Sequence, residues 1–303
     1  MENNWVSYKN GNYTVALDTV HGTKIRYNNL SFFKADRPEN MDIKITNKCN
    51  MGCAFCHENS TCDGKHSDAL NSKFLETLPE WTECAYGGGN VLEYPDLVPL
   101  LRKSKNLHLI SNITVNQKHF MENLSLLREL SNQKLIYGLG ISLTNPYEEG
   151  FIAAVKTFPN AVIHVINGVV TLAQLSALGC KDLKILILGY KEVRRGVAYK
   201  ADVDHMVEFR KNRLYASLPF IAEHNWFKTI SFDNLALEQL EPKRFLSDEF
   251  YQTHNLGDDG LMGEQTSASY YVDLVENVFA RNSCDVNHRY PLENHTATEC
   301  YQL

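Results

Sequence analysis

Three cysteines lie within eight residues of one another, and their thiols are the side chains best placed to do chemistry. They are Cys49, Cys53 and Cys56, in the run Cys-Asn-Met-Gly-Cys-Ala-Phe-Cys. Three thiolates on an irregular loop can surround one face of a compact inorganic core, and a [4Fe–4S] cluster usually takes four. Three would leave one iron without a protein ligand, and metal sites that do chemistry keep such an open position. The spacing is therefore compatible with a reactive cluster.

A structural zinc site is the alternative for this triplet. It would need a fourth ligand, for which His57, Cys62 or His66 is available nearby. Zinc loops usually pair two cysteines and then a second, distant pair, and no second pair follows here. The C-terminal Cys284 and Cys300 could hold zinc or a small cluster, but we interpret them as surface or packing residues.

The triplet follows the first strand of a long alternation of short apolar strands and amphipathic helices. Six such alternations predict a parallel sheet with helices outside, either an open doubly wound sheet or a barrel. A seventh strand is expected at 229–232. The expected strands are 41–46, 83–86, 107–111, 135–143, 161–165 and 183–188, and the expected helices are 72–78, 97–103, 118–131 and 172–178.

The two ends of the chain have different patterns. Residues 13–17 and 24–27, with a turn near His21 and Gly22, predict a β-hairpin. Near the C-terminus, apolar and polar residues alternate on either side of Glu276 and Asn277, which predicts another hairpin. We therefore expect three parts, which are an N-terminal β-hairpin extension (1–40), a core (41–235) and a β-containing C-terminal cap (236–303).

A glycine-rich turn follows the second expected strand. It reads Cys-Ala-Tyr-Gly-Gly-Gly-Asn-Val-Leu-Glu-Tyr-Pro-Asp-Leu over 84–97. Glycine allows a backbone to approach a ligand without a Cβ in between. A plain strand–helix turn would also explain these glycines.

Taken together, the triplet, the aromatic Phe55 before its last cysteine and the glycine turn resemble the radical S-adenosylmethionine (radical SAM) superfamily. The resemblance covers roughly residues 41–235 and implies a partial (β/α)6 TIM-type barrel. It implies that Cys49, Cys53 and Cys56 bind a [4Fe–4S] cluster whose open iron is chelated by S-adenosylmethionine. Reductive cleavage of that cofactor to a 5′-deoxyadenosyl radical would then abstract hydrogen from a substrate.

The resemblance also implies a cofactor pocket. Gly88 and Gly89 match the family's glycine pair, while Asn90 stands where the family has glutamate and Val91 where it has proline. An asparagine oxygen can still accept a hydrogen bond from the methionine amine. The residues expected to contact the nucleoside are Phe55, Ser142 and Asn167.

Composition narrows the class of partner. The net charge of -6 argues against broad nucleic-acid binding, which needs surplus Lys and Arg. A basic spot at Lys191, Arg194 and Arg195 could hold one phosphate, or it could be a solvated loop. No apolar run approaches the roughly 20 residues of a membrane span, and the N-terminus lacks the pattern of a secretion signal. We expect a cytoplasmic protein.

The expected function is thus a radical SAM enzyme, with a peptide or protein side chain as the first hypothesis for its substrate. A nucleotide or other small metabolite is the alternative within the same chemistry, and a non-catalytic iron–sulfur or zinc module is the alternative from another class. The enzyme would require an external electron donor of the flavodoxin or ferredoxin type.

Overall fold

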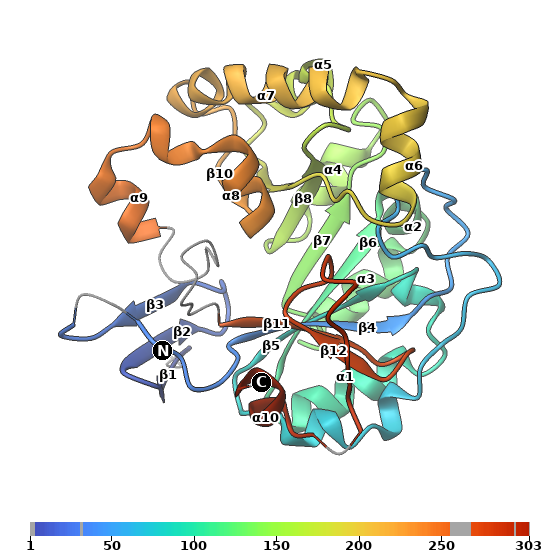
Figure 1. The fold of residues 1–303 in the computed structure, drawn as a ribbon, viewed down its shortest axis with the longest axis vertical. Helices are drawn as coiled ribbons and strands as arrows, with labels where there is room; N and C mark the ends of the chain where they lie inside the picture. Colours follow the sequence, from blue (N-terminus) through green and yellow to red (C-terminus); the bar gives the residue numbers. More distant parts are fainter. Residues whose placement is uncertain (1–3, 31–32, 255–267, 294, 303) are drawn as a thin grey trace.

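The structure, a computed structural model, describes residues 4–30, 33–254, 268–293 and 295–302. Its strands form a small antiparallel sheet of three strands and a large sheet of ten (Figure 1). The small sheet contains β1 (Trp5–Asn10), β2 (Tyr13–Asp18) and β3 (Lys24–Tyr27). The large sheet contains β4 (Asn40–Thr46), β5 (Glu83–Gly88), β6 (Ile110–Asn116), β7 (Gly138–Ser142), β8 (Ala161–Ile166), β9 (Lys184–Leu188), β10 (Thr229–Phe232), β11 (Ser269–Asp273), β12 (Val278–Ala280) and β13 (Tyr290–Pro291).

Helices connect most strands of the large sheet. The α-helices are α1 (Leu97–Asn106), α2 (Gln117–Glu122), α3 (Leu124–Asn132), α4 (Phe151–Lys156), α5 (Leu172–Leu178), α6 (Arg195–Asp202), α7 (Met206–Glu223), α8 (Asn234–Leu240), α9 (Asp248–His254) and α10 (Ala297–Gln302). Four 3-10 turns are η1 (Ala69–Asn71), η2 (Phe74–Thr77), η3 (Val91–Glu93) and η4 (Pro242–Arg244). None of the helices in the described part of the chain is long and apolar enough to cross a bilayer.

Strands β4 to β10 are neighbours in chain order, and every adjacent pair is parallel. The predicted parallel sheet is therefore confirmed, including the seventh strand at Thr229–Phe232. Because strand–helix–strand crossovers are right-handed, this sequential order places the helices on one face of the sheet. It is a mixed α/β fold built on a large parallel sheet.

Some predicted boundaries differ from the structure. The third strand begins at Ile110 rather than Leu107, because Leu107 is the C-cap of α1 and donates its backbone N–H to the Lys103 carbonyl. The helix expected over 118–131 is divided at Asn123 into α2 and α3, and that expected over 72–78 is only the 3-10 turn η2. Short apolar runs do not distinguish a strand from a helix end, which explains the first of these errors.

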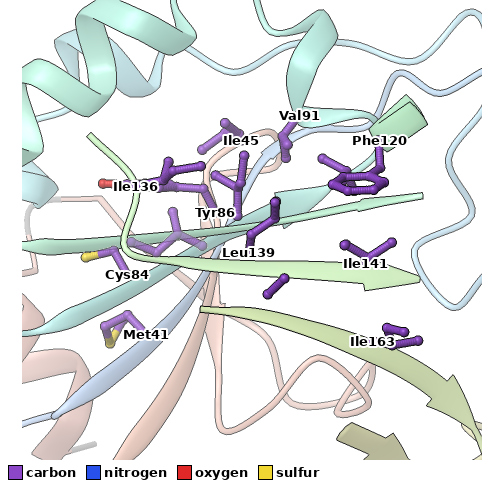
Figure 2. Close-up of a cluster of buried hydrophobic side chains, with 14 of the residues drawn as sticks. Met41, Ile45, Cys84, Tyr86, Val91, Phe120, Ile136, Leu139, Ile141 and Ile163 are labelled. Carbon is purple, nitrogen blue, oxygen red and sulfur yellow. The ribbon is translucent and has the colours of Figure 1, made fainter. Parts of the chain in front are cut away.

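The two faces of the large sheet differ in chemistry. Met41, Ile43 and Ile45 of β4 are buried against the helices, as are Cys84 and Tyr86 of β5. Figure 2 shows this core, in which side chains of β4 to β8 meet apolar residues of the surrounding helices and loops. Successive side chains in a strand point to opposite faces. The other face, here called the inner face, therefore carries the alternate residues, among them Asp42, Lys44, Gly87, Thr114 and His164.

The C-terminal hairpin predicted around Glu276 and Asn277 is confirmed, because β11 and β12 pair antiparallel. It extends the main sheet directly, since β11 pairs with β4 in parallel and places Tyr271 opposite Asp42 and Asp273 opposite Lys44. The N-terminal hairpin is likewise confirmed as β2 and β3, and β1 adds a third strand that was not expected. The three-part division of the chain remains a prediction.

Candidate active site

The three cysteines lie on the loop that follows β4, here called the cysteine loop (residues 47–62). The base of the loop is fixed by two backbone hydrogen bonds, from Cys49 N–H to the Thr61 carbonyl at 2.8 Å and from Thr61 N–H to the Asn47 carbonyl at 3.2 Å. Cys56 N–H donates to the Cys53 carbonyl at 3.2 Å, which turns the chain between the last two thiols. All three thiols are half-buried and free, so they are available as ligands.

The thiols lie within one another's electric field. Burial raises the pKa of the Cys53 thiol, and negative charge on Cys56 or Cys49 raises it further. Burial also raises the pKa of Cys49, and Cys56 and Glu93 add to the effect, while the Arg195 guanidinium opposes it. A group that takes all three as thiolates must supply positive charge, as the irons of a cluster do. The donor set therefore fits an iron–sulfur cluster. Across the described residues, no three His, Cys, Asp or Glu side chains are gathered for one metal ion.

The glycine turn at the end of β5 packs directly on the cysteine loop. A Cβ at Gly88 would overlap the Thr46 carbonyl oxygen, and Gly88 has a φ of +108° that favours glycine. A Cβ at Gly89 would overlap the Lys48 carbonyl oxygen. The glycines thus bring two backbones together, with Gly89 N–H donating to the Thr46 carbonyl at 2.8 Å.

Asn90 continues this contact but uses its side chain locally. Its backbone N–H donates to the Lys48 carbonyl at 2.7 Å. Its side-chain oxygen accepts from Leu92 N–H at 3.2 Å, and its amide donates to a Glu93 carboxylate oxygen at 3.0 Å. Since Asn90 is buried and caps η3, the carboxylate that faces the cysteines from this turn is Glu93, whose charge acts on Cys49.

Helix α6 and the residues before it hold the cysteine loop from the other side. Phe55 meets Tyr199 of α6 edge to face, with ring centroids 5.6 Å apart. Arg195 donates to the Ser60 carbonyl at 2.7 Å, and Arg194 donates to the His57 carbonyl at 3.0 Å. The basic spot predicted at 191–195 is therefore turned toward the loop, and Lys191 donates to the Ser283 hydroxyl at 2.9 Å.

A buried charge network lies beneath the loop. Lys44 pairs with Glu58 at 3.1 Å and with Asp273 at 2.9 Å, and these side chains are 2%, 6% and 0% exposed. Burial alone would raise the pKa of Glu58, but positive charge on His57, Lys44 and Arg194 lowers it to about 2. His57 is neutral at neutral pH, because burial and the positive charges of Lys191, Arg194 and Lys44 lower its pKa to about 3. Lys44 and Arg194 are then the cations that act on Glu58. The network joins β4, the cysteine loop and β11.

The two remaining nucleoside candidates lie in different places. Ser142 ends β7 beside Asn116 of β6 and His164 of β8, on the inner face. Asn167 is fully buried, and its amide donates to Gln239 of α8 at 3.0 Å. The structure therefore brings Ser142 to the edge that carries the cysteine loop and directs Asn167 toward a helix.

The alternative zinc ligands are also placed. His66 hydrogen-bonds the Thr46 hydroxyl at 2.9 Å, His57 faces Glu58 at 3.4 Å, and Cys62 is exposed. Cys300 is buried in α10, where burial raises the pKa of its thiol to about 12, whereas Cys284 is half-buried in the turn after β12.

Sequence reasoning missed the residues that support the loop. Lys44 gave a signal, because a charged residue interrupts the apolar strand at an inner-face position. Arg194 and Glu58 gave none that could pair them, since 136 positions separate them in the chain.

Comparison with known proteins gives a result at the level of the fold. No protein-family model matches the sequence, and no curated protein does. Among solved structures, Streptococcus suis SuiB bound to its precursor peptide SuiA is similar with a TM-score of 0.62 and 11% identity, over 98% of this chain and 87% of that one. SuiB bound to S-adenosylmethionine has a TM-score of 0.60 at 11% identity, over 99% and 87% of the two chains. Both structures are of a radical SAM enzyme.

This chain has the fold of radical SAM enzymes. A third structure with that fold, native anSMEcpe with bound AdoMet, has a TM-score of 0.51 at 16% identity and covers 87% of this chain and 80% of its own. The likeness extends beyond the region of sequence resemblance (41–235), since the alignments with SuiB include nearly the whole chain.

Proposed function

We propose that this chain is a radical SAM enzyme in which Cys49, Cys53 and Cys56 bind a [4Fe–4S] cluster. The observation that carries the proposal is the contact between the cysteine loop and the glycine turn of β5, within a fold that radical SAM enzymes share. We also propose that β4 to β9 with their helices form a partial (β/α)6 barrel whose interior is the inner face.

When bound, the cluster and S-adenosylmethionine would supply a 5′-deoxyadenosyl radical that abstracts hydrogen from the substrate. The protein's own residues hold and shield these groups. The glycine turn fixes the position of the cysteine loop, and Glu93 presents a carboxylate beside Cys49 that can accept a hydrogen bond from the methionine amine. Phe55, held by Tyr199, and Ser142 at the end of β7 would border the nucleoside.

A peptide or protein side chain is the proposed substrate. Two observations support it, namely the similarity to SuiB bound to a precursor peptide and the open arrangement of the large sheet. Among the described strands, β10 and β13 are its two edges and do not pair with each other. An open sheet leaves its inner face accessible from the side, which suits a substrate carried on a chain. An external flavodoxin or ferredoxin is the proposed electron donor.

The test is anaerobic reconstitution with iron and sulfide, followed by reduction with S-adenosylmethionine and an assay for 5′-deoxyadenosine. We expect the parent protein to form the nucleoside and Cys53→Ala to form none. Cys62→Ala is the matched control, because Cys62 is an exposed cysteine just beyond Cys56 and should leave nucleoside formation intact. A cluster that forms without any cleavage would favour a non-catalytic iron–sulfur module instead.

A further inference from the structure

Polar and small residues alternate from strand to strand across the inner face. Asp42 on β4, Thr114 on β6 and His164 on β8 present polar side chains. Between them, β5 presents Ala85 and Gly87, and β7 presents Gly138 and Gly140. Because neighbouring strands lie about 4.8 Å apart, the side chains of β4 and β6 stand about 10 Å from each other. Two troughs result, one over β5 and one over β7.

The trough over β7 is filled by the protein itself. A Cβ at Gly140 would overlap His164 Cε1 and would lie 2.7 Å from both His164 Nε2 and Thr114 Oγ1. The imidazole therefore lies across Gly140 toward Thr114. Burial lowers the pKa of His164 to about 4, so the ring is neutral at physiological pH.

The trough over β5 is open. A Cβ at Gly87 would have no atom within 4 Å, although Gly87 pairs with Lys44 of β4 in the middle of the sheet. Its carboxyl end runs into Gly88 and Gly89, which touch the cysteine loop. A group lying over Gly87 would thus extend toward the proposed cluster.

The β4 wall of this trough contains one carboxylate that the described residues leave available. Lys44 is occupied by Glu58 and Asp273, and Asn112 accepts a hydrogen bond from Gly138 N–H at 2.7 Å. The Asp42 side chain has no hydrogen bond or ion pair to any described residue, and Lys191 is the cation that acts on it most strongly. The Thr114 hydroxyl is directed into the other trough, because it would lie 2.7 Å from a Cβ at Gly140. Asp42 keeps solvent-accessible surface, and desolvation by its surroundings raises its pKa.

We propose that the trough over β5 is the substrate-binding site and takes a polar side chain whose tip donates hydrogen bonds, an amine or an amide. The Asp42 carboxylate accepts those hydrogen bonds, and the absence of a side chain at Gly87 makes room for the stem. This assignment rests on the proposed function, because a substrate in this trough can react only if the protein generates the radical.

Chemical labelling tests the site without knowledge of the substrate. In a Gly87→Cys variant, the new thiol is treated with the cationic reagent 2-aminoethyl methanethiosulfonate or with its anionic 2-sulfonatoethyl analogue. The rate at position 87 is read by peptide fragmentation and divided by the reagent's rate with a free thiol. Cys84 is the internal control, because it lies in the same strand but is buried in the core on the opposite face.

We expect position 87 to react at least tenfold faster than Cys84, with a roughly tenfold preference for the cationic reagent. Asp42→Asn should abolish that preference. A thiol at 87 as unreactive as Cys84 would show that the trough is closed. A preference for the anionic reagent, which the nearby Lys191 would cause, or a cationic preference that survives Asp42→Asn, would contradict the substrate class.

Two features keep the result interpretable. Ala85→Cys, at the position that pairs directly with Asp42, repeats the measurement if Gly87→Cys does not fold. Labelling does not depend on cleavage of S-adenosylmethionine. If the parent forms 5′-deoxyadenosine but position 87 is unreactive, the trough assignment fails and the enzyme class stands. If position 87 is reactive but the parent forms no 5′-deoxyadenosine, the enzyme class is rejected.

Discussion

At the scale of single residues, the glycines of this protein differ in what surrounds them. Gly88 and Gly89 make room for backbone, Gly140 makes room for the His164 ring, and Gly87 faces open space. The same residue type therefore has a packing role at three positions and a different role at the fourth.

This difference predicts that the same substitution has a large effect on stability at Gly140 and a small one at Gly87. Gly140→Ala should destabilise the protein by about 1–3 kcal/mol, because the new methyl group overlaps His164 and crowds Thr114. Gly87→Ala should change the free energy of unfolding by less than about 1 kcal/mol, since the methyl group meets nothing and alanine restricts the unfolded chain. Urea unfolding of both variants checks the pair, and equal losses would contradict the packing described for β7.

His164 also predicts a pH dependence of stability. Its folded pKa is about 4 against an ordinary value of 6.5, because burial disfavours the charged ring. Above pH 6.5 both states are neutral and this contribution is complete. As the pH falls from 6.5 toward 4, the unfolded chain binds a proton that the folded protein does not, and stability falls by up to about 1.4 kcal/mol per pH unit.

A His164→Gln variant should therefore lose less stability than the parent between pH 7 and pH 5. Urea unfolding at intervals across this range measures the difference. His205→Gln, at a side chain that is 94% exposed, is the control and should follow the parent curve. Identical slopes for the parent and His164→Gln would show that His164 is not buried in solution.

At the scale of elements, the cysteine loop is held by α6 and by Arg194, the residue before it, whose backbone is strained. Arg194 has a φ of +50°, which costs a non-glycine residue about 1–3 kcal/mol. The compensation is visible, because its guanidinium binds the His57 carbonyl at 3.0 Å and Glu58 at 3.3 Å. The strained residue thus connects α6 to the loop.

Removing this connection should loosen the proposed cluster. Arg194→Gln is expected to increase the rate at which a chelator extracts iron from the reconstituted protein several-fold, because the loop loses one of its attachments. Arg213→Gln, on the exposed side of α7, is the control. Absorbance of the iron–chelator complex over time gives both rates, and an unchanged rate for Arg194→Gln would remove this residue from the support of the loop.

Helix α5 packs on the side of the sheet opposite the inner face, and we expect a substitution at its N-terminus to affect stability alone. Thr171 begins α5 with a capping box, in which its hydroxyl accepts from Gln174 N–H at 3.2 Å. Thr171→Ala should cost about 1 kcal/mol of unfolding free energy, whereas Ser176→Ala, on the exposed side of the same helix, should cost little. Thermal unfolding of the two variants measures the difference in stability. Neither substitution should change the formation of 5′-deoxyadenosine, and equal stability of the two variants would contradict the capping role of Thr171.

At the scale of the whole molecule, the buried network around Lys44 holds distant parts of the chain together. Glu58 comes from the cysteine loop and Asp273 from the C-terminal strand β11, and both bind the same ammonium group. Arg289, between β12 and β13, adds a further contact to Asp273 at 3.5 Å. The cysteine loop and the C-terminal strands therefore depend on one another.

Lys44→Met should accordingly destabilise the whole protein by about 3–5 kcal/mol, since it leaves two buried carboxylates without their shared cation. Urea unfolding measures the loss, and Lys118→Met, at a lysine that is 61% exposed, is the control. A Lys44→Met protein as stable as the parent would mean that Arg194 and Arg289 are sufficient for Glu58 and Asp273.

The sequence by itself determined the parts that depend on local pattern. Apolar periodicity predicted the parallel strands and both hairpins, because burial on one face imposes a repeat that is readable within ten residues. The cysteine triplet and the glycine turn were also readable, since each is a short contiguous motif.

Only the tertiary structure decided how these parts meet. Several contacts join segments that are far apart in the chain. They are the approach of Gly89 to Lys48, the ion pair of Arg194 with Glu58, and the pairing of β11 with β4. The open trough over β5 also depends on tertiary structure, because a glycine in a strand leaves open space only if the neighbouring strands do not fill it. Long-range packing and charge pairing select among many compatible arrangements, and no local pattern encodes that choice.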